Sequence, residues 1–226
     1  MTMYSSPSSS DAQAAQTRSG CLLRFLLPPV SVILVGIGLA LFLSQIQVDL
    51  VETAPLPEEK SVLSSKQIAP LFSPEVLAWE ENILNWSEKY HLDPNLIATV
   101  MQIESCGYSR AKSSAGAMGL FQVMPYHFKE GEDPYQPGTN ARRGLNYLRQ
   151  ALESGGSARL ALAGYNGGIN GAQNPEEYWP DETLRYLYWG VRIYKDAKEG
   201  KDHSLRLEEW LNSGGNSLCL AARNEN

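Results

Sequence analysis

The chain of 226 residues has few of the side chains that usually build metal sites. It contains three cysteines and three histidines, which form neither a Cys-x-x-Cys pair nor a His-Glu-x-x-His helix. A zinc site is therefore not expected. The acidic residues Glu130, Glu132 and Asp133 lack the spacing of a calcium-binding loop, which favours a solvated loop over a calcium site.

A surplus of positive charge is also missing. The chain has 19 Lys and Arg against 25 Asp and Glu, a net charge of −6. Proteins that bind a phosphate backbone use excess cations to release counterions, so nucleic acid is not expected as a partner. Hydrophobic residues make up 43% and charged residues 19%, a composition typical of a folded chain. The length allows one domain with appendages.

The first part of the chain differs in composition from the rest. Residues 1–24 are rich in Ser, Ala, Gln and Thr, which predicts a disordered tail. No charge occurs from Phe25 to Leu43, and a helix of this length spans about 28 Å against a hydrocarbon core of roughly 30 Å. We predict one transmembrane signal anchor over residues 25–50, with a cleaved signal peptide as the alternative.

Charges on the two sides of this segment predict its orientation. Arg18 and Arg24 precede the uncharged run, whereas Asp49 and Glu52 follow it, so the tail is expected in the cytoplasm and the remainder on the periplasmic or extracellular side. Residues 51–72 contain several prolines, typical of a semi-extended linker. The folded domain is then expected over residues 73–226.

This domain is expected to be all-α, because helix signals recur and no alternating strand pattern competes. Ser73-Pro74 and Asp93-Pro94 each combine an N-cap residue with a proline at the first helical position. The first signal is followed by apolar side chains at helical spacing as far as Trp86. Further helices are predicted at 94–105, at 140–153, after Ser157, after Asp181 and around 204–212.

The predicted helix from Pro94 to Ser105 carries an acid among its apolar side chains. At about 100° per residue, Glu104 falls near the middle of the apolar arc, at about 80° from Leu96. A desolvated carboxyl group has a raised pKa, as a general acid requires at neutral pH. The alternatives are that Glu104 turns to solvent at the helix end or pairs with Arg110.

Two other segments combine polar side chains with glycines. Gln122 is embedded in the apolar stretch 113–125, where its amide must bind either backbone groups or a sugar. Residues 163–168, Ala-Gly-Tyr-Asn-Gly-Gly, are compatible with a simple helix end capped by glycine. They lack the lysine of a phosphate-binding loop.

Four ordered motifs together resemble the lytic transglycosylase domain of glycoside hydrolase family 23, which is related to goose-type lysozyme. The motifs are Glu104-Ser105, the segment from Gly119 to Gln122 with the following Met124-Pro125, Tyr165-Asn166, and Glu182-Thr183 with Tyr186. The resemblance covers about residues 74–200. It implies a lysozyme-like helical fold.

The resemblance also implies a role for each matching residue. Glu104 would be the catalytic acid and base, and the groove that binds substrate would be formed by Ser113, Gln122, Met124, Tyr165, Asn166, Glu182 and Tyr186. The sequence departs from the family pattern at Phe121, at Gly164 and Gly167, and after Ser105, where the usual Asn-Pro is absent. These departures affect the expected groove walls and leave the catalytic position intact.

The implied activity is cleavage of peptidoglycan glycan strands next to the membrane, without a metal or cofactor. In such an enzyme the N-acetyl group of the substrate attacks the anomeric carbon and its C6 hydroxyl replaces water, which leaves a 1,6-anhydro sugar. Two alternatives remain: hydrolysis of the same bond in the manner of lysozyme, and a wall-binding scaffold without catalysis.

A few other residues have two interpretations. Cys106 and Cys219 both lie in the part expected outside the cytoplasm, where disulfides persist, and they either pair or remain free thiols. Tyr108, Trp179 and Trp189 either stack on sugar rings or belong to the core, and the helical setting of Trp189 favours the core.

Overall fold

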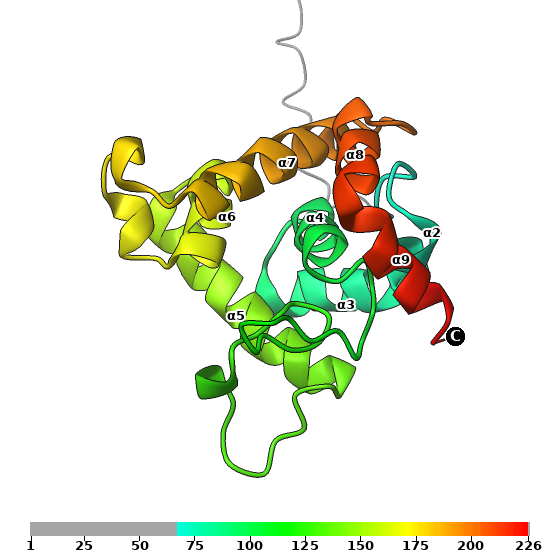
Figure 1. Cartoon of the computed structure of the whole chain (residues 1–226), viewed down its shortest axis with the longest axis horizontal. Helices are drawn as coiled ribbons and strands as arrows, with labels where there is room; N and C mark the ends of the chain where they lie inside the picture. The colour runs from blue at the N-terminus through cyan, green and yellow to red at the C-terminus, as the bar shows by residue number, and fades with distance from the viewer. Residues whose placement is uncertain (1–66, 226) are drawn as a thin grey trace, which may run out of the picture. The chain divides into compact units, whose positions relative to one another are not determined.

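The structure is a computed structural model that describes residues 67–225 (Figure 1). In chain order its helices are α2 (Pro74–Leu77), α3 (Glu80–Tyr90), α4 (Pro94–Glu104), η1 (Pro125–His127), α5 (Pro137–Gly155), α6 (Ala158–Gly167), η2 (Gly171–Gln173), η3 (Glu176–Tyr178), α7 (Asp181–Lys198), α8 (Leu205–Trp210), η4 (Leu211–Gly215) and α9 (Asn216–Arg223). Within this part of the chain the only β pairing is two isolated bridges. The predicted all-α class is therefore confirmed for the domain.

The predicted tail, the transmembrane anchor and most of the linker fall outside the described residues. Among the helices of residues 67–225, none combines the length and the apolar character that a membrane span needs. The domain begins earlier than position 73, because Ile68, Leu71 and Phe72 are buried in the core. The backbone N–H of Ala69 also donates to the side chain of Asn95 at 2.8 Å.

Helix α4 lies in the middle of the fold and packs against α2, α3 and α7 (Figure 1). Its polar side is buried as well as its apolar side, since Thr99 and Gln102 have no exposed surface. Both side chains are satisfied internally. Thr99 donates to the carbonyl of Asn95 at 2.7 Å, and Gln102 accepts from the backbone N–H of Ser73 at 3.0 Å.

The helical signal that starts at Ser73 produces two helices rather than one. The backbone leaves the helical path at Trp79, the residue before α3, where φ is −96° and ψ is 8°. The indole N–H of Trp79 donates to the carbonyl of Gly107 at 3.0 Å. This tertiary contact places Trp79 over the end of α4, and the expectation of a continuous helix is wrong at this point.

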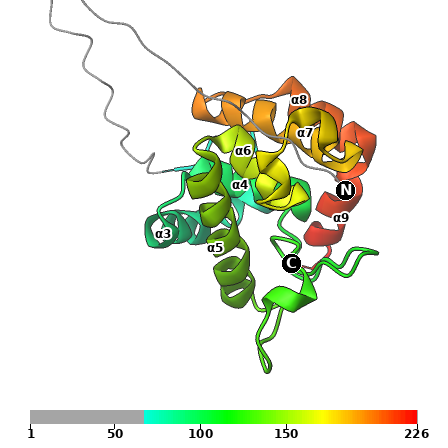
Figure 2. The ribbon, with the colours of Figure 1, turned by 90° about the vertical axis from the view of Figure 1, so that its left-hand side faces the viewer.

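Helix α5 runs along one side of the domain beside α3 and α6, as Figure 2 shows. Helix α7 then packs on α6 and α4, and α9 returns to α2. The long connection between α4 and α5, residues 105–136, contains no helix except η1. This connection and the inner faces of α5, α6 and α7 form the walls of the site described below.

Candidate active site

Glu104 is the last residue of α4, and local chemistry fixes both ends of this helix. At the start, the carboxylate of Asp93 accepts from the backbone N–H groups of Asn95 and Leu96. At the end, Cys106 and Gly107 adopt left-handed conformations, with φ values of 52° and 82°. A β-carbon on Gly107 would lie 2.6 Å from the carbonyl oxygen of Glu75. Only glycine fits this close approach.

Ser105 joins the end of α4 to the turn that contains Gln122. Its hydroxyl donates to the carbonyl of Leu120 at 2.7 Å and accepts from the backbone N–H of Gly107 at 3.1 Å. The serine side chain is fully buried, so both bonds are shielded from water. The Glu-Ser pair of the sequence therefore places the acid and the turn side by side.

Asn140, on α5, holds the same turn from the other side. Its Oδ1 accepts from the backbone N–H of Phe121 at 2.8 Å, and its Nδ2 donates to the carbonyls of Met118 and Pro134 at 2.7 and 2.8 Å. A β-carbon on Gly119 would lie 2.3 Å from the Asn140 amide nitrogen. The sequence analysis did not single out Asn140.

An open groove of about 420 Å³ lies between this turn and helices α5, α6 and α7. Of the residues assigned from the sequence, those that line it are Glu104, Ser113, Gln122, Met124, Tyr165, Asn166 and Glu182. Tyr186 is buried behind the wall. We call this hollow the Glu104 groove. A larger hollow of about 710 Å³ lies elsewhere, around Trp179 and the end of α5, and contains none of these residues.

The Glu104 carboxyl group is protonated at neutral pH. Its pKa is raised from the usual 4.5 to about 8: burial is the largest cause, a hydrogen-bonding interaction with the Tyr186 hydroxyl opposes it, and the negative charge of Glu182 adds to it. Glu104 still lines the groove. The same carboxyl group is thus both desolvated and accessible from the groove. It does not pair with Arg110, the alternative considered above, because the Arg110 guanidinium lies 3.4 Å from the carboxylate of Glu225.

Two tyrosines flank this acid. The Tyr165 hydroxyl donates to the carbonyl of Phe121 at 2.6 Å. The Tyr186 hydroxyl is buried without a hydrogen bond of ordinary geometry, although it lies close enough to Glu104 to lower that group's pKa. Burial raises the pKa of both phenols well above 10, so both stay neutral beside the acid.

Gln122 and Asn166 are held by the protein itself. The Gln122 amide nitrogen, Nε2, donates to the carbonyls of Ala111 and Gly119 at 3.2 and 3.0 Å. Of the two alternatives considered for this amide, backbone groups or a sugar, the structure shows the backbone. Asn166 accepts from the hydroxyl of Thr183 at 2.9 Å. Both side chains are therefore fixed in position before any ligand arrives.

The aromatic candidates from the sequence lie outside the Glu104 groove. Trp179 lines the larger hollow, Trp189 packs against the core, and Tyr108 is not among the groove residues. The groove has other aromatic walls, which the sequence analysis missed: Tyr126, His127 and Tyr147. Helical spacing could have pointed to Tyr147, because Asn140, Gly144 and Tyr147 fall on one face of α5.

The acidic segment 130–133 is not simply a solvated loop. The carboxylate of Glu132 accepts from Arg142 at 2.9 Å, from Arg143 at 2.6 and 2.9 Å, and from the backbone N–H of Lys129 at 2.9 Å. These donors lower the pKa of Glu132 to about 2, with the Arg143 hydrogen bond as the largest cause. Glu132 therefore acts as an ionised anchor for two guanidinium groups.

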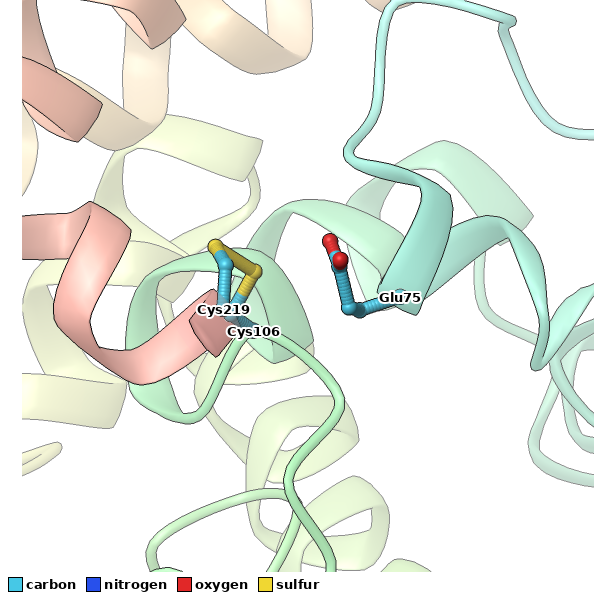
Figure 3. Close-up of side chains that lie close together, drawn as sticks. All are labelled: Glu75, Cys106 and Cys219. Atoms are coloured by element: carbon cyan, nitrogen blue, oxygen red, sulfur yellow. A yellow bond between two sulfur atoms is a disulfide. The ribbon is translucent and has the colours of Figure 1, made fainter. Parts of the chain in front are cut away.

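A disulfide joins Cys106, two residues after Glu104, to Cys219 on α9. Figure 3 shows the side chain of Glu75 beside this bridge. Ligand atoms of the three side chains lie within 4.8 Å of one another. Among residues 67–225 this is the one cluster with potential metal ligands, and its sulfurs are already bonded to each other. An intact bridge leaves no thiolate for a metal.

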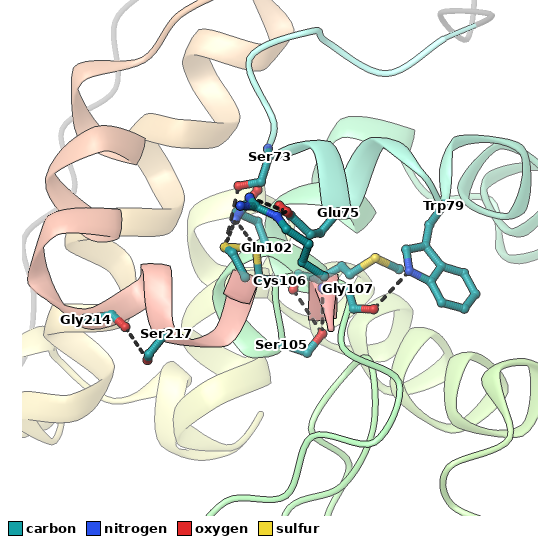
Figure 4. The surroundings of a disulfide bond; sticks show 12 residues. Ser73, Glu75, Trp79, Gln102, Ser105, Cys106, Gly107, Gly214 and Ser217 are labelled. Atoms are coloured by element: carbon teal, nitrogen blue, oxygen red, sulfur yellow. Dashed lines mark hydrogen bonds and ion pairs between the residues drawn. A yellow bond between two sulfur atoms is a disulfide. The ribbon is translucent and has the colours of Figure 1, made fainter. Parts of the chain in front are cut away.

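The surroundings of the bridge connect both ends of the domain (Figure 4). Gln102 donates to the sulfur of Cys106 at 3.1 Å. Arg223 donates to one oxygen of Glu75 at 2.6 and 2.8 Å, while the other oxygen is buried without a partner. Helix α9 is therefore attached covalently to the connection just after α4, and to α2 by a partly buried ion pair.

The fold and the site define the class of protein: an all-helical domain with one protonated carboxylic acid in the wall of an open polar groove. Residues 81–183 match the family model described as Transglycosylase SLT domain. This segment contains Glu104, Gln122, Tyr165 and Glu182. This match supports a lytic transglycosylase domain in this part of the chain, in line with the motifs found in the sequence.

Individual relatives agree with this assignment. A protein named Transglycosylase from Enterobacteria phage PRD1 is 40% identical over 112 residues, which cover 49% of this chain and 40% of the phage protein. Membrane-bound lytic murein transglycosylase E from Buchnera aphidicola subsp. Acyrthosiphon pisum (strain APS) is 31% identical over 83 residues, which cover 31% of this chain and 38% of that protein. The match thus spans about two fifths of each relative.

Among solved structures, the lytic transglycosylase Slt from Pseudomonas aeruginosa, an inactive mutant, is similar to this chain with 22% identity and a TM-score of 0.44. The match covers 56% of this chain and 25% of the Slt chain.

Proposed function

We propose that this protein is a peptidoglycan lytic transglycosylase that cleaves the β-1,4 bond between N-acetylmuramic acid and N-acetylglucosamine with formation of 1,6-anhydro-N-acetylmuramic acid. One observation carries the proposal: the carboxyl group of Glu104, with a pKa of about 8, lines the same groove as Gln122 and Tyr165. A proton donor that remains protonated at neutral pH is what cleavage of a glycosidic bond requires.

The proposed reaction begins with Glu104 as an acid. Its proton moves to the glycosidic oxygen while the bond between that oxygen and the anomeric carbon of the muramic acid breaks. The N-acetyl oxygen of the same sugar bonds to the anomeric carbon. The Glu104 carboxylate then takes the proton of the C6 hydroxyl, whose oxygen displaces the N-acetyl oxygen. The acid is regenerated and no water is consumed.

Within the described residues, one other carboxyl group lines the groove, that of Glu182. It is exposed at the first turn of α7. Two-carboxylate glycosidases keep an ionised nucleophile or water activator opposite their acid. We assign Glu182 to the cleft and to the pKa of Glu104, and in the proposed intramolecular reaction the N-acetyl and C6 hydroxyl groups of the substrate take the place of a second catalytic carboxylate.

The reaction product tests the proposal. Digestion of isolated cell wall should release fragments lighter by one water than hydrolysis products, as measured by mass spectrometry. Glu104→Gln should reduce the release at least about 10³-fold, since the amide cannot donate the proton. Glu81→Gln, an exposed acid on α3, is the matched control and should lyse normally. Hydrated products would instead support a lysozyme-type hydrolase, and full lysis by Glu104→Gln would refute the catalytic assignment.

The same variant should keep its fold. Because the pKa of Glu104 is raised in the folded state, the folded protein holds a proton that the unfolded chain releases between about pH 4.5 and 8. Stability is therefore lost as pH rises through this window. The Glu104→Gln variant avoids this loss, so its melting temperature should exceed that of the parent increasingly from pH 5 to pH 8. A large decrease at all pH values would indicate a structural role.

We further propose that residues 25–50 anchor the enzyme in the membrane, with residues 1–24 in the cytoplasm and the domain on the outer side. The support is the uncharged segment and the charge difference around it. Extraction of membranes at alkaline pH tests the anchor: the full chain should stay in the pellet, and a chain without residues 1–50 should not. Release of the full chain would contradict anchoring.

A further inference from the structure

The Glu104 groove continues beyond the catalytic centre. A second hollow of about 230 Å³ adjoins it and is lined by His127, Arg142, Arg143, Asn146, Tyr147 and Gln150. His127, Arg143 and Tyr147 line both hollows. The two hollows therefore share a wall and form one path along α5.

Aromatic rings mark this path. The ring centroid of Tyr165 lies 5.9 Å from that of Tyr147, which lies 5.1 Å from that of His127, which in turn lies 4.5 Å from that of Tyr126. Tyr126 is 74% exposed. A row of rings that starts next to Glu104 and ends in solvent can contact a ligand larger than the two sugars at the scissile bond.

The far end of the path is positively charged. Arg142 and Arg143 share one carboxylate, that of Glu132, so the group retains one net positive charge. His127 adds none, because burial and the neighbouring Arg143 lower its pKa. Arg143 uses Nε and Nη2 on Glu132, and Arg142 uses Nη2. Each guanidinium therefore retains N–H groups for a second acceptor.

The near end of the path has the opposite charge, since Glu182 lines it and the protonated Glu104 adds no positive charge there. An elongated ligand with carboxylates along one side is repelled from Glu182 and attracted to the two arginines. Glu132 holds Arg143 in place before the ligand binds, which reduces the entropy lost on binding. The distribution of charge thus selects one orientation of such a ligand.

We propose that Arg142 and Arg143 form a binding site for a carboxylate of the peptide attached to the muramic acid, so that the enzyme prefers glycan strands that carry peptide stems. This inference rests on the proposed function, because it places the scissile bond at Glu104 and the peptide along the path toward α5. Arg142 and Arg143 are specificity residues in this proposal and take no part in bond cleavage.

Binding to the full-length chain with Glu104→Gln tests the site without turnover. Three soluble glycan oligosaccharides are compared by calorimetry: one with peptide stems, one with the stem carboxylates amidated, and one without peptides. The stem-bearing ligand should bind about tenfold more tightly than the other two, because one charge-assisted hydrogen bond contributes an affinity gain of about this size. Adding Arg142→Gln and Arg143→Gln together should reduce this preference to less than about twofold.

Matched variants separate this effect from damage to the fold. Arg149→Gln changes an arginine of the same helix that pairs with Glu153 outside both hollows, and the preference should persist. Arg142→Gln alone leaves the Arg143–Glu132 pair intact and should lose part of the preference, even if the double variant does not fold.

Each other outcome overturns the inference. Equal affinity for stem-bearing and amidated ligands excludes carboxylate recognition, and a preference that survives the arginine substitutions places the recognition elsewhere. If anhydro products form and yet stems make no difference, the inference fails while the proposed function stands. If none of the oligosaccharides binds, the proposed function fails and the inference fails with it.

Discussion

Two side chains next to Glu104 change its pKa in opposite directions. Tyr186 lowers the pKa and Glu182 raises it. Tyr186→Phe should therefore raise the pKa of Glu104, and Glu182→Gln should lower it. Because the acid must be protonated to act, the alkaline limb of kcat/KM against pH should move to higher pH in the first variant and to lower pH in the second.

A pH profile on soluble glycan strands measures both shifts. Tyr188→Phe provides the control, since this exposed tyrosine of the same helix bonds to Glu209. General loss of structure would reduce the rate at every pH without moving the limb. Shifts in the same direction for both variants would contradict the assignment of the limb to Glu104.

Some of these residues could be found from the sequence, and others could not. The helical period alone placed Glu104 among apolar neighbours, because those neighbours belong to its own helix. The motifs supplied Gln122 and Tyr165. Arg143 and His127 reach the groove only because the connection 105–136 folds against α5, and that packing has no local signal in the sequence.

Helix α5 supports the turn around Gln122 through one side chain. Asn140 is fully buried, and its amide makes three hydrogen bonds to the backbone of this turn and of Pro134. Asn140→Ala leaves those groups unpaired and should destabilise the domain by about 2–4 kcal/mol. Denaturant unfolding measures this loss.

The same substitution should reduce lysis by more than the unfolded fraction explains, because the turn forms one wall of the Glu104 groove. Asn170→Ala, in an exposed position before η2, should change neither stability nor lysis by a measurable amount. Normal lysis by a folded Asn140→Ala variant would show that the turn keeps its shape without this support.

At the level of helices, capping signals were more informative than apolar spacing. Pro94 and Asp181 mark the starts of α4 and α7, as the sequence predicted. The break between α2 and α3 was missed, because it depends on the contact of Trp79 with Gly107, 28 positions away. Helix α9 was also missed: its position depends on the disulfide and on the Glu75–Arg223 ion pair, which are tertiary contacts.

The complete domain is closed by the disulfide, whose two cysteines are 113 positions apart. Closing so long a loop restricts the unfolded chain strongly, which should contribute about 3–5 kcal/mol to stability. Cys106→Ser combined with Cys219→Ser should lose this amount in denaturant unfolding. Reduction of the parent with dithiothreitol should produce a similar loss and should leave the double variant unchanged. An equal response of both proteins to the reductant would contradict this account.

The position of this bridge has a consequence for the order in which the protein is made. A nascent chain that has emerged only as far as α7 already contains Glu104, Gln122 and Tyr165. Cys106 has no partner at that stage, because Cys219 is still to be synthesised. The cross-link next to the acid can therefore form only after the chain has been synthesised past Cys219, and only where conditions are oxidising.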